Sequence, residues 1–174
     1  MVPASYNIYF ATMATAAAAL IGLLFVAISQ RDETIFGSHA TPGGEALAIT
    51  AFTGLVNSFV VSLLSLLPSG RIGIVATVMA VSSIITIVRL NSRLRAARSG
   101  IVLVITLIVY VIQLSYGITL ISSPHGGGRL TDLAYVLFVT LLVSLQRAWS
   151  LQRGAHLRQA TGAVERTGRQ GATD

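Results

Sequence analysis

The run from Glu45 to Leu67, EALAITAFTGLVNSFVVSLLSLL, limits what this chain can fold into more than any other feature. It has 23 residues and a single charge, which lies at its start. An α-helix rises about 1.5 Å per residue, so a run of this length matches the ~30 Å hydrocarbon core of a bilayer. Inside lipid a backbone must satisfy its own hydrogen bonds, which a helix does. The run therefore predicts a transmembrane helix.

Four other apolar runs accompany this one, and the composition agrees with a membrane location. Only 10% of the residues are charged, against about a quarter in soluble domains. The mean hydropathy is +0.77. The sequence predicts an all-α polytopic membrane protein, with a five-helix transmembrane bundle over residues 1–152 and a polar, Arg-rich cytoplasmic tail over residues 153–174. The expected helices cover residues 6–29, 45–67, 72–90, 100–121 and 130–149.

The first run has an alternative interpretation as a signal peptide, because Ala27-Ile28-Ser29 resembles a small-x-small cleavage site. No positive charge precedes the run, however. Its apolar core is also longer than the roughly 7 to 15 residues of a signal peptide. We therefore expect a spanning helix there.

The arginines predict an orientation. All twelve basic residues are arginine, and ten of them fall in loops and a tail that would share one side of the membrane. By the positive-inside rule that side is cytoplasmic, which places the N-terminus outside and the C-terminus inside. These arginines have two interpretations, contact with anionic lipid headgroups or with an acidic cytoplasmic partner. The candidates are Arg89, Arg93, Arg95, Arg98, Arg147 and Arg153.

Small residues at four-residue spacing mark two helices. The first helix carries Ala14, Ala18 and Gly22, and the second carries Gly54, with Ser58 and Ser62 following it. Such spacing lets helix backbones approach closely, which matters in lipid because the hydrophobic drive between helices is small. The stripes predict tight packing within the chain, or alternatively an oligomer interface or pore wall.

Uncharged polar residues form a belt near the middle of the expected spans. An amide or hydroxyl in hydrocarbon needs a partner for its donors and acceptors. The belt predicts interhelical hydrogen bonds that fix the bundle, or alternatively a polar ring that lines a water-accessible path in a homo-oligomer. Its members are Asn57, Ser82, Ser83, Tyr110, Gln113 and Thr140. Ser58 and Ser62 on the second helix are further candidates for the polar network or pore.

Enzymatic chemistry has no residues to support it, so we expect no catalytic site, cofactor or metal. The chain has no cysteine. His39, His125 and His156 would be divided between two sides of the membrane, which prevents a three-histidine metal site. His125-Gly126-Gly127-Gly128 has no accompanying GxSxG elbow, so we interpret it as a loop. We also expect no ionisable side chain other than tyrosine well inside a span, and no nucleic-acid partner.

Two segments, AAAALIGLLFVAIS (Ala16–Ser29) and AFTGLVNSFVVSLLSLLP (Ala51–Pro68), resemble small bacterial integral membrane proteins of uncharacterised function. The resemblance implies a location in the bacterial cytoplasmic membrane and implies no activity. From the residues themselves, we expect a small homo-oligomeric channel or passive permeation protein for ions or small solutes, with the polar face of the second helix lining the path. The alternative is a non-transporting scaffold or regulatory subunit that acts through its Arg-rich cytoplasmic face.

Overall fold

The structure, a computed structural model, describes residues 4–29, 42–67, 71–93, 100–122 and 127–170. In these ranges the chain is all-helical, and the prediction of five helices long and apolar enough to span a membrane is confirmed. The helices are α1 (Ala4–Ser29), α3 (Pro42–Ser65), α4 (Ile72–Arg93), α5 (Gly100–Ser122) and α6 (Gly127–Gln170).

The ends of α3 show why the helix lies where it does. It begins at Pro42, three residues before the expected start, because a proline in the first turn gives up an N–H that has no partner there anyway. It ends at Ser65, after which the N–H groups of Leu66 and Leu67 donate to carbonyls three residues back, at 3.2 and 3.3 Å. Such bonds tighten the last turn of a helix.

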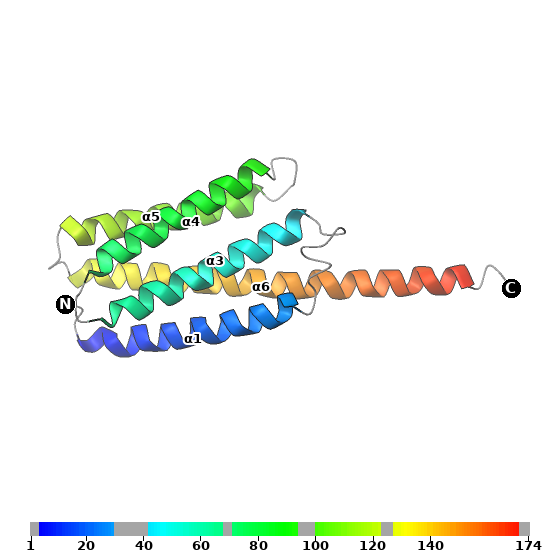
Figure 1. The fold of residues 1–174 in the computed structure, drawn as a ribbon, viewed down its shortest axis with the longest axis horizontal. Coiled ribbons are helices and arrows are strands. Elements are labelled where there is room, and N and C mark those ends of the chain that lie inside the picture. Colours follow the sequence, from blue (N-terminus) through cyan, green and yellow to red (C-terminus); the bar gives the residue numbers. More distant parts are fainter. Residues whose placement is uncertain (1–3, 30–41, 68–70, 94–99, 123–126, 171–174) are drawn as a thin grey trace.

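Four of the helices form a ring. Within the described residues, α3 contacts α4, α4 contacts α5, α5 contacts α6, and α6 contacts α3 again. The diagonal pairs, α3 with α5 and α4 with α6, show no close backbone contact in the same residues. Helix α1 lies outside the ring, against α3 and α6. Figure 1 shows the resulting three layers, with α4 and α5 in the first, α3 and α6 in the second, and α1 in the third.

The buried residues of α5 follow one another at intervals of three and four, and in the other ring helices the same spacing recurs with some adjacent residues buried as well. This spacing is that of the inward-facing seam of a four-helix bundle, where side chains of neighbouring helices interlock. In α5 the buried positions are Thr106, Tyr110, Gln113, Gly117 and Leu120, and in α6 they include Leu133, Leu137, Thr140, Ser144 and Arg147.

The bundle is apolar outside and mixed inside. Large apolar side chains such as Ile8, Phe25 and Val78 are exposed on its surface, with 60% or more of their area accessible. The interior holds an apolar core and, beside it, many buried hydroxyls and amides. This distribution is typical of helices that face lipid, since polar side chains there turn inward to find partners.

Helix α1 attaches mainly through apolar side chains, among them Phe10, Met13 and Ala17. Two tyrosines add hydrogen bonds to α6. The Tyr6 hydroxyl bonds the Thr131 hydroxyl at 2.5 Å, and the Tyr9 hydroxyl donates to the Ala134 carbonyl at 2.7 Å.

Helix α6 is much longer than the expected 130–149. It is a single helix of 44 residues, and its last part projects past the ends of the other helices (Figure 1). The predicted tail, residues 153–174, therefore continues the fifth span as helix as far as Gln170. Side chains after Ser150 lie outside the described part of the structure.

Candidate functional site: a polar core in the four-helix ring

The centre of the ring is occupied by an amide pair. Asn57 of α3 donates from Nδ2 to Gln113 Oε1 at 2.8 Å, and Gln113 of α5 returns a bond from Nε2 to Asn57 Oδ1 at 3.0 Å. The same Gln113 nitrogen donates to the carbonyl of Ala76 in α4 at 3.3 Å. Both amides have 0% of their surface accessible. Three ring helices are thus joined at one point, in the interior of the chain itself.

A second polar layer lies next to the amide pair, towards the N-terminal end of α5. The Tyr110 hydroxyl lies close enough to the Ser83 side chain of α4 to interact with it. Gly54 of α3 faces both Tyr110 and Ser144 of α6: a Cβ built on it would lie 3.4 Å from the tyrosine hydroxyl and 3.2 Å from Ser144 Cβ, and against Ser144 Oγ. The missing side chain of Gly54 is therefore what lets α3, α5 and α6 converge here.

The serines of α3 extend the core towards α6. Ser58 donates to the Leu137 carbonyl at 3.3 Å, and Thr140 bonds the carbonyl of Val136 in its own helix at 2.7 Å. Ser62 differs from both. Among the described residues, its hydroxyl is the one buried side-chain polar atom without a hydrogen-bond partner.

Arg147 occupies a position that differs from the expected one. With 6% of its surface accessible, it lies between α6 and α5 and donates from Nη2 to the Thr106 hydroxyl. It is also close enough to Tyr110 to interact with it electrostatically. We expected Arg147 at an exposed helix end in contact with headgroups or a partner. Because Arg147 follows Thr140 and Ser144 on the inward face of α6, its side chain lies within the bundle and adds a positive charge to one end of the polar core.

Ser144 and Thr106 belong to the core but were absent from our candidates. The sequence held a signal for both: Ser144 follows Thr140 by four residues and Thr106 precedes Tyr110 by four, so each pair shares a helix face. The predicted polar residues are buried except Ser82, which is exposed. The structure brings Asn57 together with Gln113 and Gly54 together with Tyr110.

The small-residue stripe of α1 is divided by the structure. Ala14 is buried, whereas Ala18 and Gly22 are exposed, and a Cβ on Gly22 would meet nothing within 4 Å. Within the chain, close approach instead occurs between α4 and α5. A Cβ on Gly117 would lie 2.6 Å from the Thr77 hydroxyl and 3.0 Å from the Thr77 nitrogen.

The remaining arginine candidates lie at or beyond the described residues. Arg89 is exposed near the end of α4. The other four side chains fall outside the described part of the structure; they belong to Arg93, Arg95, Arg98 and Arg153. For Arg95 and Arg98 the backbone is outside it too. In the described residues no three acidic, histidine or cysteine side chains come together as metal ligands would.

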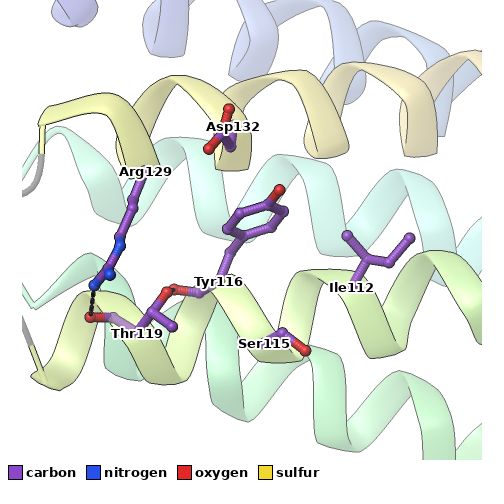
Figure 2. A pocket seen from close by; sticks show the side chains of 6 residues that line it. All are labelled: Ile112, Ser115, Tyr116, Thr119, Arg129 and Asp132. Atoms are coloured by element: carbon purple, nitrogen blue, oxygen red, sulfur yellow. Dashed lines mark hydrogen bonds between the residues drawn. The ribbon is translucent and has the colours of Figure 1, made fainter.

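A groove of about 380 Å³ lies apart from the core, between α5 and α6 near the start of α6. Figure 2 shows Arg129 of α6 reaching down to α5, where Nη1 donates to the Thr119 carbonyl at 3.4 Å. The Tyr116 ring rises from α5 towards α6, on the side of Asp132 (Figure 2). Ser115 and Ile112 complete the lining.

Searches against protein-family models, curated proteins and solved structures found no match, so the chemistry of this chain rests on its own residues.

Proposed function

We propose that this chain is a small membrane permeation protein for ions or small solutes, and that the path runs through the polar core inside each protomer. The observation that carries the proposal is the succession of buried hydrogen-bonding groups along the ring, from Thr106 and Arg147 through Tyr110 to Asn57 and Gln113. Paths for ions and solutes through membranes are built from such oxygens and amides.

This proposal moves the path from where the sequence suggested it. We expected the polar face of the second helix, α3, to line an axis shared by several protomers. Asn57 and Ser58 of α3 instead bond to α5 and α6 of their own chain. Side chains that are bonded inside one chain cannot line an axis between protomers. We therefore place the proposed path within the ring.

The amide pair supplies a closed state. Asn57 and Gln113 satisfy each other across the ring, and a solute passing between them has to replace those bonds with its own. This exchange of hydrogen bonds has little net cost, since each amide offers two N–H donors and a carbonyl oxygen with two lone pairs to water or to the solute. Ser62, whose buried hydroxyl lacks a partner among the described residues, offers a further site on α3.

Solute flux into proteoliposomes tests the proposal. Wild type should pass at least one small ion or neutral solute, and Asn57→Ala should change the rate or the selectivity several-fold. Ser115→Ala is the matched control, since Ser115 is exposed on α5 and bonds only the Val111 carbonyl of its own helix in the described structure. Folded wild type that passes none of the common small ions and solutes would defeat the proposal.

A second candidate function, a non-transporting scaffold or regulatory subunit, is favoured by the length of α6. The projecting part of α6 carries Arg153, Arg158, Arg166 and Arg169 in its sequence, which would suit an acidic cytoplasmic partner. Deletion of residues 153–174 separates the two. Loss of a captured partner together with silent wild type in flux assays favours the scaffold, whereas unchanged flux after the deletion favours the path through the bundle.

Orientation, membrane and assembly belong to the same proposal. The arginine distribution supports a bacterial cytoplasmic membrane with the N-terminus outside, and arginines in contact with anionic headgroups. A reporter inserted at residues 94–99 should then be cytoplasmic. The exposed Ala18 and Gly22 on α1 support a homo-oligomer, because small residues allow a second helix to approach. Gly22→Leu should therefore reduce cross-linking between protomers.

A further inference from the structure

We infer that the groove between α5 and α6 binds the headgroup of a phospholipid that carries both a phosphate and a primary ammonium, as phosphatidylethanolamine does. The groove is distinct from the polar core, and the inference is independent of the proposed permeation function. It rests on the charges that line the groove, on its depth in the expected membrane, and on its shape.

Two opposite charges line the groove without neutralising each other. Arg129 and Asp132 are three residues apart on α6, a spacing at which ion pairs often form. No ion pair joins them in the described structure, since the Arg129 guanidinium turns to the Thr119 carbonyl on α5. Figure 2 shows the two side chains directed to different parts of the groove. A ligand with separated negative and positive groups can therefore contact both.

The chemistry of each group selects its counterpart. A guanidinium carries five N–H donors, and the bond to the Thr119 carbonyl uses one of them, which leaves donors of Arg129 for phosphate oxygens. The Asp132 carboxylate accepts hydrogen bonds from a primary ammonium. A trimethylammonium group has no N–H to donate, and a headgroup without a cation leaves the carboxylate facing a phosphate. Phosphatidylethanolamine thus fits better than phosphatidylcholine or phosphatidylglycerol.

The groove lies at the depth where a headgroup meets its acyl chains. Arg129, one of its two charged lining residues, is the first residue of the span Arg129–Ser150. Thr119 is three residues from the end of the span Val104–Ser122. Ile112 lies seven residues further along α5, or about 10 Å deeper at the rise of an α-helix. The wall is therefore polar at the interface and apolar towards the bilayer centre. A volume of about 380 Å³ is that of a small ligand site, sufficient for a headgroup and the start of a chain.

Lipid binding to the purified full chain, measured by native mass spectrometry, tests the inference. The three lipids, with identical acyl chains, are titrated separately. We expect phosphatidylethanolamine to bind at least several-fold more tightly than the other two. Asp132→Asn should reduce its affinity to that of phosphatidylcholine while leaving phosphatidylcholine unchanged, and Arg129→Gln should weaken all three.

Arg71→Gln is the matched control, because Arg71 is exposed near the start of α4 and does not line the groove. All three substituted residues are exposed, so the variants should fold, which circular dichroism checks. Equal affinity of wild type for phosphatidylethanolamine and phosphatidylcholine would overturn the inference. So would discrimination that survives in Asp132→Asn. Displacement of the lipid by an equal concentration of soluble phosphoethanolamine would overturn the assignment to a lipid.

Discussion

Asn57 and Gln113 exchange two hydrogen bonds across the four-helix ring, although their helices make no close backbone contact with each other in the described residues. Side chains bridge this diagonal: the two amides, and Tyr110 of α5, whose hydroxyl faces Gly54 of α3. Because α4 and α6 hold α3 and α5 apart, the amide pair also fixes how far each helix is rotated. A rotation of either helix would remove its amide from reach of the other.

We predict that breaking the amide pair destabilises the bundle. Asn57→Ala leaves Gln113 buried without its main partner, and an unsatisfied buried polar group costs about 1–3 kcal/mol. The double variant Asn57→Ala/Gln113→Ala should cost less than the sum of the single changes. Reversible unfolding in mixed detergent and SDS micelles measures all three. We expect a coupling free energy of about 0.6 kcal/mol, up to ~1.7, as for side-chain pairs in other membrane bundles. Additive single changes would show that the amides act separately.

Gly54→Ala should destabilise the protein, because the new methyl group would press on the Ser144 hydroxyl and on its Cβ. Rotating that hydroxyl away breaks its 2.8 Å bond to the Thr140 carbonyl. Overpacking of this kind costs about 1–3 kcal/mol. Gly22→Ala is the control, since a Cβ there meets nothing within 4 Å. Equal stability of the two variants, measured in the same micelles, would contradict the tight contact at Gly54.

Gly117→Ala should separate α4 from α5. The added Cβ would lie 3.0 Å from the backbone nitrogen of Thr77, and a backbone atom cannot turn aside as a side chain can. We expect a loss of stability of about 1–3 kcal/mol, again from overpacking. The unfolding midpoint in the same micelles measures this loss. Ser115→Ala, two residues away on the exposed side of α5, should leave that midpoint unchanged.

Arg147→Met should have opposite effects on stability and on permeation. Taking a charged side chain out of water carries a desolvation penalty of roughly several kcal/mol, so an apolar side chain of similar length should leave stability unchanged or raise it. Under the proposed function the same change removes the positive charge from one end of the path and so lowers the permeability to anions relative to cations. Reversal potentials under a salt gradient report this ratio. An unchanged ratio in a conducting variant would remove Arg147 from the path.

The five helices and the buried belt could be predicted from the sequence for different reasons. Hydropathy over 18 or more residues identifies a span without any knowledge of its neighbours. Polar residues such as Asn57 and Gln113 could be named because a buried amide is costly wherever it points. Their pairing could not be predicted. It joins residues 56 apart and depends on how each helix is rotated in the ring.

Helix ends and helix contacts could be predicted less fully than the spans. Helix α6 continues through a polar sequence that hydropathy cannot distinguish from a tail, and Arg147 lies on its inward face, three residues after Ser144. The spacing of Ala14, Ala18 and Gly22 identified a smooth helix surface, yet the contact face of α1 follows Phe10 and Met13 instead. Small-residue spacing indicates where close approach is permitted, and only the partner decides whether it occurs.

The attachment of α1 to α6 has a consequence for how the protein is made. Tyr6 and Tyr9 each bond a residue 125 positions later in the chain. The ribosome synthesises α1 first and α6 last, so neither hydrogen bond can form until nearly the whole chain has been translated. During that interval α1 has α3 as its neighbour from the same chain, and the side of α1 that α6 later covers stays open to lipid or to an insertion factor. The contact of α1 with α6 therefore belongs to the last steps of folding.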